Sequence, residues 1–209
     1  VLKIIATPLT GSAADDGTPS GGNNISGMAI LGTKLYLVAN GDIYIRNSAG
    51  SYAVHNNHKT FDNIWSMKGR LVASGTNGEL YEVTGTSNPA TIKALPTGSS
   101  WTDVTDGGAV VLACADDGYI YSLADESSTL TIKGQTFVEG EVPNAIDAAQ
   151  GFIFYGTYQN TASGKIGRLY RAEITNANSL YVLINAQLIK QWGDGASTLD
   201  QAPYRIIST

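Results

Sequence analysis

The stretch Val111-Leu-Ala-Cys-Ala-Asp-Asp-Gly-Tyr-Ile-Tyr121 decides the fold of this chain. It begins as a short apolar strand, turns at Asp117-Gly118, and continues as a strand that carries a tyrosine. Asn, Asp and Gly best tolerate the positive φ of a two-residue hairpin turn, so Asp-Gly marks a hairpin. A continuously apolar strand is typical of burial on both faces. The stretch therefore predicts a hairpin whose first strand lies in the interior of the fold.

The same order of apolar strand, glycine turn and apolar-tyrosine pair occurs four times, at residues 35–44, 71–81, 111–121 and 152–170. The tyrosines stand at positions 44, 81, 121 and 170, so their spacings are 37, 40 and 49 residues. We attribute the longest spacing to an insertion at residues 159–165, which is predicted to lengthen the loop. A period of about 40 residues with this content predicts a four-stranded unit.

Each unit is predicted to contain a first strand before a glycine turn, a buried second strand, a third strand with the tyrosine, and a more polar fourth strand. The predicted first strands are residues 25–31, 61–67, 101–105 and 145–149. The predicted fourth strands are residues 52–56, 90–95, 130–137 and 180–189. No stretch with helical periodicity is longer than about two turns. The repeated tyrosines are expected to pack one unit against the next.

These repeats resemble β-propellers, in the loose sense shared by the WD40, kelch and quinoprotein-type families. The resemblance covers nearly the whole chain as a pattern, and the signature motif of each of these families is missing. It implies an all-β propeller of four-stranded antiparallel blades. The implied segments are the last strand of an incomplete blade at 1–11, blades at 12–56, 57–95, 96–138 and 139–190, and a loop with the first strand of a further blade at 191–209.

A β-sandwich does not predict a 40-residue period, and a β-helix predicts a shorter one. Four blades with two stray strands could close by pairing the chain ends, pair with a second copy, or form part of a larger propeller. Unpaired strand edges invite association. We therefore expect a piece of a larger propeller or assembly, with other protein chains or a second copy as partners.

The composition excludes several classes of function. The chain has 209 residues with 13 Lys and Arg against 18 Asp and Glu, a net charge of −5, which argues against a nucleic-acid partner. Apolar runs such as Ala109-Val-Val-Leu-Ala113 are far shorter than the roughly 20 residues of a spanning helix, so no membrane insertion is expected.

Motifs for nucleophilic catalysis and for phosphate or dinucleotide binding do not occur in the sequence. Asp62 and Asp103 are the candidate catalytic residues, because first strands approach the channel of a propeller and paired carboxylates hydrolyse glycosides. The competing interpretation is that such aspartates cap turns or bond neighbouring blades. His55 and His58 have a ligand-like spacing but lack a third metal ligand. No metal and no cofactor are expected.

Four residues on the loops around the channel are candidates for binding a ligand, namely Trp101, Trp192, Asp117 and Tyr158. Aromatic rings there could stack on a sugar. Three functions are therefore considered: a structural or interaction module, a glycan-binding propeller, and a glycosidase or lyase. The first is expected, because the repeat is similar in style to propellers of bacteriophage tail hubs and adhesion devices. That resemblance implies a virion or extracellular location.

Overall fold

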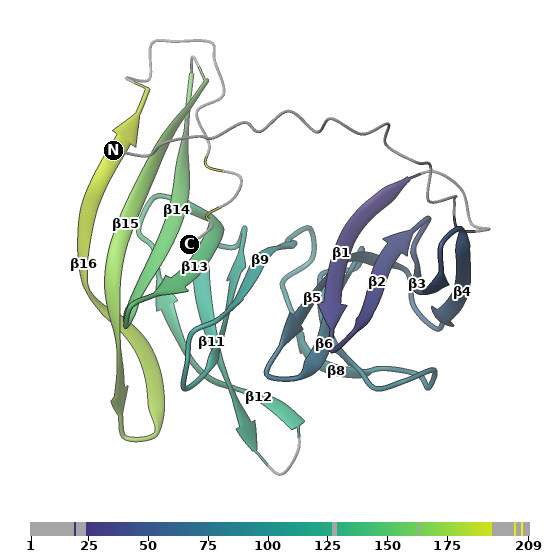
Figure 1. Cartoon of the computed structure of the whole chain (residues 1–209). Coiled ribbons are helices and arrows are strands. Elements are labelled where there is room, and N and C mark those ends of the chain that lie inside the picture. The colour runs from purple at the N-terminus through teal and green to yellow at the C-terminus, as the bar shows by residue number, and fades with distance from the viewer. Residues whose placement is uncertain are drawn as a thin grey trace, which may run out of the picture.

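The computed structural model describes residues 24–126, 129–162 and 164–193, together with Pro19, Pro203 and Ile206 (Figure 1). Within these residues the chain forms sixteen strands and no helix, so no helix there could span a membrane. The predicted terminal strands at 1–11 and 191–209 fall outside the described residues, apart from 191–193, Pro203 and Ile206.

The strands build four antiparallel sheets, each from four strands that are consecutive in the chain. The first sheet contains β1 (Ile25–Leu31), β2 (Lys34–Ala39), β3 (Asp42–Ser48) and β4 (Ser51–Asn56). The second contains β5 (Phe61–Met67), β6 (Arg70–Gly75), β7 (Glu79–Val83) and β8 (Ala90–Ala94). The third contains β9 (Trp101–Asp106), β10 (Val111–Ala115), β11 (Tyr119–Glu126) and β12 (Thr129–Phe137). The fourth contains β13 (Val142–Ala149), β14 (Phe152–Thr161), β15 (Gly164–Ala177) and β16 (Leu180–Trp192).

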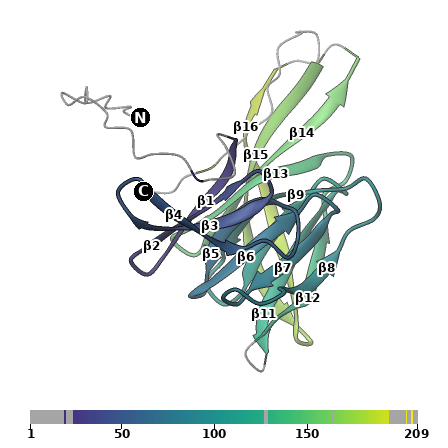
Figure 2. The ribbon, with the colours of Figure 1, turned by 90° about the vertical axis from the view of Figure 1, so that its right-hand side faces the viewer.

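The four sheets follow one another in an open arc, with the first and fourth sheets at its two ends (Figure 1). Figure 2 looks at this arc from the side of the first sheet. The first strands touch in chain order, β1 with β5, β5 with β9, and β9 with β13. An all-β fold of four-stranded antiparallel sheets, as predicted from the repeat, is confirmed.

The core consists of the layers between successive sheets, because the second strand of each sheet is buried on both faces. Every residue of β10 is buried, and Val111 packs toward the second sheet while Leu112 packs toward the fourth. Side chains of successive residues point to opposite faces of a sheet. A sheet that lies between two others therefore requires a second strand that is apolar at every position.

The repeated tyrosines pack each sheet against the preceding one. Tyr81 lies in the core next to the first sheet, Tyr121 next to the second, and Tyr170 next to the third. The hydroxyls of Tyr81 and Tyr121 donate to carboxylates at the hairpin turn, Glu79 at 2.5 Å and Asp117 at 2.6 Å, and the Tyr170 hydroxyl donates to Glu141, just before β13, at 2.9 Å. The ring is thus buried while its polar tip stays satisfied.

A buried carboxylate also ties the second sheet to the third. Glu82 is 4% exposed, and its Oε1 accepts a hydrogen bond from Arg70 Nη1 at 2.5 Å. Its Oε2 accepts from the backbone N–H of Leu130, in β12, at 3.1 Å. The second nitrogen of Arg70 reaches Asp125 of the third sheet at 2.8 Å. A buried charge that is paired and hydrogen-bonded in this way avoids most of its desolvation penalty.

The insertion at 159–165 differs from its prediction as a loop. β14 and β15 continue as a paired ladder to the Thr161–Gly164 pair, so the added residues mainly lengthen the hairpin (Figures 1 and 2). β15 and β16 extend in the same way at their other end, as far as the Ala177–Leu180 pair. Paired extension satisfies backbone hydrogen bonds that a loop would leave to water.

Alkaline pH is expected to destabilise the fold through the repeated tyrosines. Burial, followed by the hydrogen bond to Glu79, raises the pKa of Tyr81 to about 12. The unfolded chain releases this proton near pH 10, about two pH units lower. The stabilisation that Tyr81 contributes is therefore fully present below about pH 10 and is lost as the pH rises toward 12. Urea unfolding across this range measures the slope, and Tyr81→Phe should reduce it. A phenolate absorbance change assigned to Tyr81 near the ordinary tyrosine pKa would contradict this.

Gly134→Ala is expected to destabilise the contact between β12 and β16. A Cβ at Gly134 would overlap the backbone oxygen of Tyr181, where the two strands cross closely. Because backbone cannot move aside without breaking its ladder, the free energy of unfolding should fall by roughly 1–3 kcal/mol. The exposed neighbour provides the control, since Gln135→Ala should change the free energy of unfolding, measured by chemical denaturation, by less than about 0.5 kcal/mol. Equal midpoints for the two variants would show that the close approach does not exist.

Candidate functional site

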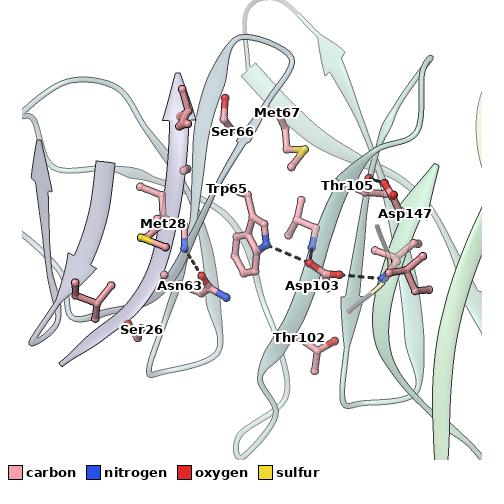
Figure 3. A pocket seen from close by; sticks show the side chains of 18 residues that line it. Ser26, Met28, Asn63, Trp65, Ser66, Met67, Thr102, Asp103, Thr105 and Asp147 are labelled. Carbon is pink, nitrogen blue, oxygen red and sulfur yellow. Dashed lines mark hydrogen bonds between the residues drawn. The ribbon is translucent and has the colours of Figure 1, made fainter. Parts of the chain in front are cut away.

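A cavity of about 680 Å³ lies where the first strands of the four sheets converge (Figure 3). Its walls come from β1, β5, β9 and β13, and Ile206 adds to them. This is the place of the central channel in a propeller, where ligand sites are commonly sought. Its lining mixes serine, threonine and asparagine with Trp65, two methionines and two aspartates.

The same irregularity occurs in every first strand. The register shifts between Ile25 and Gly27 in β1, between Phe61 and Asn63 in β5, and between Pro143 and Ala145 in β13. In β9 the shift lies between Trp101 and Asp103, which pair with Ala115 and Cys114 of β10. One residue of each first strand thus leaves the ladder, as in a β-bulge, which redirects a side chain. These four residues are Ser26, Asp62, Thr102 and Asn144.

Two of the bulge residues bond the next segment along the arc. Thr102 Oγ1 donates to the Pro143 carbonyl at 3.0 Å, and Asn144 Nδ2 donates to the Pro203 carbonyl at 2.8 Å. Pro203 also lies so close to Gly156 that a Cβ there would stand 2.6 Å from its Cγ. Ile206 follows Pro203 by the same three positions that separate Ile146 from Pro143, and both isoleucines line the cavity.

Asp103 holds three sheets together at the wall of this cavity (Figure 3). Its Oδ1 accepts hydrogen bonds from Trp65 Nε1 of the second sheet at 3.2 Å and from its own neighbour Val104 N at 2.9 Å. Its Oδ2 accepts from Ile146 N of the fourth sheet at 3.0 Å. Both oxygens are thus engaged by donors of the fold, which is the bonding role that the sequence offered as the alternative to catalysis.

The two candidate catalytic aspartates do not meet in the cavity. Asp62 is exposed and lies outside the cavity lining. The second carboxylate of the lining is Asp147, which accepts from Ala148 N at 2.9 Å and from Thr105 Oγ1 at 3.2 Å. Sequence reasoning missed Asn63 and Asp147, although their places one residue after the bulge residue Asp62 and three residues after the bulge residue Asn144 were the available signal.

Trp101 does not have the position that ligand stacking requires. It is 4% exposed, its Nε1 donates to the Gly78 carbonyl at 3.0 Å, and its ring meets Tyr121 edge-on at 5.2 Å. The side chain therefore packs between the second and third sheets. The predicted ligand contact at Trp101 does not agree with this burial.

The other three candidate ligand residues separate into two places. Asp117 and Tyr158 line a second cavity of about 380 Å³, between the β10–β11 turn and the long β14–β15 hairpin. Trp192 is 37% exposed at the end of β16, where it pairs with Gly167. Lys165 Nζ lies 4.3 Å from the centre of the Tyr158 ring.

Cys114 and the histidines have local partners. Cys114 is fully buried, and burial together with the charge of Asp103 raises the pKa of its thiol. His55 packs edge-on to Tyr36 at 5.0 Å, and burial and Lys34 lower its pKa. His58 Nε2 lies 3.0 Å from the Thr86 carbonyl. Within the described ranges, no three His, Cys, Asp or Glu side chains come together as metal ligands would.

Comparison with known proteins shows similarity of fold. No family model matches the chain, and no curated protein sequence is detectably similar. An extracellular domain assigned to a hybrid two component system of B. thetaiotaomicron superposes with a TM-score of 0.62 at 14% identity, over 89% of this chain and 25% of that one. The chain thus spans about a quarter of that protein's length.

Two further solved structures have the same architecture. The β-propeller domain of Myceliophteria thermophila Cps50 (Swd1) matches with a TM-score of 0.55 at 11% identity, over 85% of this chain and 62% of that domain. The computationally designed Ika4 protein matches with a TM-score of 0.53 at 15% identity, over 69% of this chain and 92% of that one. The fold is therefore that of a β-propeller, with no subfamily indicated.

Asp103→Ala is expected to weaken the whole arc. The change leaves the donors of Trp65, Val104 and Ile146 without their acceptor, and each unsatisfied buried donor costs about 1–3 kcal/mol. We expect a loss of about 2–4 kcal/mol in the free energy of unfolding, and a smaller loss for Asp103→Asn, which keeps one acceptor oxygen. Urea denaturation measures both, with exposed Asp62→Ala as the matched control. Similar stability of the Asp103→Ala and Asp62→Ala variants would show that the link is not structural.

Proposed function

We propose that this chain is a non-enzymatic interaction module, a propeller section whose end face is covered by another protein chain of an assembly or by a second copy. The observation that carries the proposal is the exposure of Met28 on the outer face of the first sheet. The other sheets bury the corresponding residue against a neighbour.

Strand register identifies the corresponding positions. Met28, Leu37, Tyr44 and Val54 form one row across β1, β2, β3 and β4, on the face that points away from the second sheet. In the later sheets, the residues that pair as Met28 does are Ile64, Val104 and Ile146, which are 1%, 3% and 2% exposed. Met28 is 64% exposed, and Ile30 beside it on the same face is 66% exposed.

The middle of that row is already built like a buried interface. Leu37 and Tyr44 are both 2% exposed and pack with Ala39, Leu35 and Tyr52. A contiguous apolar face with a buried centre and exposed apolar margins is typical of a surface that binds a partner. A further sheet placed as the second is placed on the first would cover Met28 and Ile30.

The engagement of the cavity carboxylates supports a role without catalysis. A general acid or nucleophile needs an oxygen that can approach a substrate. Both oxygens of Asp103 and one oxygen of Asp147 accept hydrogen bonds from neighbouring strands. Sheets held rigidly by these hydrogen bonds suit a protein that serves as a binding platform for another chain.

We further propose that the assembly is a virion, such as a phage tail, or another extracellular particle. The low proportion of charged residues, 15%, and the plain repeat without a subfamily signature support this. Tryptic peptides of the chain should then occur in tail particles purified from the source lysate. Their absence from such particles would remove the virion part of the proposal while leaving the interaction role.

The interaction role is tested by analytical ultracentrifugation of the purified chain over a range of concentrations. We expect the wild type to sediment as a species larger than 22.0 kDa, with Met28→Glu/Ile30→Glu reduced to the monomer. Burial of each apolar side chain contributes about 1.5–3 kcal/mol, which a charge would reverse. Asn47→Glu/Ser48→Glu, on exposed positions of β3, is the control and should associate like the wild type. A wild type that stays monomeric, alone and with candidate particle proteins, would refute the role.

A further inference from the structure

Two of the second-to-third-strand turns carry the same dipeptide, Asn40-Gly41 and Asn77-Gly78. In an asparagine-glycine pair the glycine nitrogen can attack the side-chain amide of the asparagine, because glycine has no Cβ to hinder the approach. Asparagine therefore counts among the thermolabile residues. The folded chain holds the two pairs in different ways, so their chemical reactivity should differ.

The side chain of Asn77 is held at both of its polar atoms. Its Oδ1 accepts a hydrogen bond from Glu79 N at 3.2 Å. Its Nδ2 donates to the Glu79 carboxylate and to the Tyr81 hydroxyl oxygen, the latter at 3.2 Å. The carbon between these two atoms, Cγ, is thereby fixed in position and direction. A reaction at Cγ has to break these hydrogen bonds first.

The glycine after Asn77 is also held. Gly78 is buried, and its N–H donates to the Gly75 carbonyl at 3.0 Å. Its carbonyl accepts from Leu95 N at 3.1 Å and from Trp101 Nε1 at 3.0 Å. The nitrogen that would attack Asn77 is therefore already used as a donor. It cannot turn toward the side chain without disturbing contacts of the core.

The turn at Asn40 lacks most of these restraints. Asn40 is exposed, and within the described residues its side-chain amide makes no hydrogen bond. The φ angles of 50° at Asn40 and 87° at Gly41 are those of a type I′ turn. The Ala39–Asp42 pair closes this hairpin. In the described part of the chain the Gly41 N–H has no acceptor, so both reacting groups are available.

We propose that Asn40 is a site of spontaneous deamidation, with water as the co-reactant, and that Asn77 is protected from the same reaction. The Gly41 nitrogen forms a bond to Asn40 Cγ, the Cγ–Nδ2 bond breaks, and the proton of Gly41 leaves with the amide nitrogen as ammonia. Water then opens the cyclic imide, adding its hydroxyl to a carbonyl carbon and its proton to the nitrogen. Opening at Cγ gives an aspartyl residue, and opening at the backbone carbon gives an isoaspartyl linkage.

The isoaspartyl linkage changes how the first sheet contacts the second. It runs through the side chain and so lengthens the backbone by one methylene group just before Gly41. The Gly41 carbonyl accepts from Phe61 N of β5 at 2.8 Å, and a Cβ at Gly41 would lie 2.9 Å from Thr60 Cγ2. A turn that fits so closely cannot take up an extra backbone atom in place. The linkage therefore weakens this bond and loosens the first sheet.

The site is tested by peptide mapping with mass spectrometry after incubation of the full chain in mildly alkaline buffer, both folded and in urea. In the folded chain Asn40 should lose its amide at least about tenfold faster than Asn77, because only Asn77 must break several hydrogen bonds to react. In urea the two identical dipeptides should react at similar rates. Equal rates in the folded chain, or an Asn40 that stays intact while the urea sample converts, would overturn the proposal.

Glu79→Ala is the matched variant, because it removes an acceptor of Asn77 Nδ2 and leaves the turn at Asn40 unchanged. It should accelerate the reaction at Asn77 and leave the rate at Asn40 as in the wild type. Near-ultraviolet circular dichroism verifies that the variant is folded. A folded variant with an unchanged rate at Asn77 would contradict the protection that we assign to these hydrogen bonds.

Hydrogen exchange tests the consequence for the first sheet. The isoaspartyl fraction, separated by chromatography, should exchange the amides of β2 and β3 several-fold faster than the fresh chain, with β10 unchanged. Asn40→Asp adds the negative charge without the extra methylene group and should exchange as the fresh chain does. Equal exchange in the isoaspartyl and fresh chains would show that the modification does not loosen the sheet.

Discussion

The side chain of Asp103 is the constraint on which the arrangement of the sheets depends. With two oxygens it accepts from the second, third and fourth sheets, where their first strands line the central cavity. Apolar packing alone would allow the sheets to slide along one another, because the hydrophobic effect is not directional. Hydrogen bonds from Trp65 Nε1 and from the backbone of Ile146 fix both the spacing and the register of the arc.

The architecture could be predicted because the sequence repeats its own local rules. The two-residue turns and the uninterrupted apolar strands depend on neighbouring residues alone. The eleven residues from Val111 to Tyr121 are therefore enough to predict β10 and the hairpin that follows it. The insertion at 159–165 was located correctly but was not recognised as strand. Whether added residues pair depends on both sides of the hairpin having extended partners, which is a relation between segments that periodicity does not describe.

The sites were less predictable, for a physical reason. Trp101 and Asp103 were chosen as chemical groups near a channel, but their functional atoms are taken up by Gly78, Trp65 and Ile146. A sequence shows which donors and acceptors exist and does not show which of them are already satisfied. Phe137, which is 57% exposed at the end of β12, was not a candidate, because no motif or turn signal in the sequence marks it. Only the folded chain separates the occupied groups from the available ones.

An arc whose sheets touch in chain order has a further consequence for how the molecule opens. The two inner sheets are held on both sides, while the first sheet is held within the described chain mainly through the second. Stability in such a row is approximately a sum of nearest-neighbour terms, as in solenoid proteins. Local opening should therefore be graded along the row, with amide exchange slowest in β6 and β10 and faster in β2, so that the first sheet can detach as a unit while the rest remains folded.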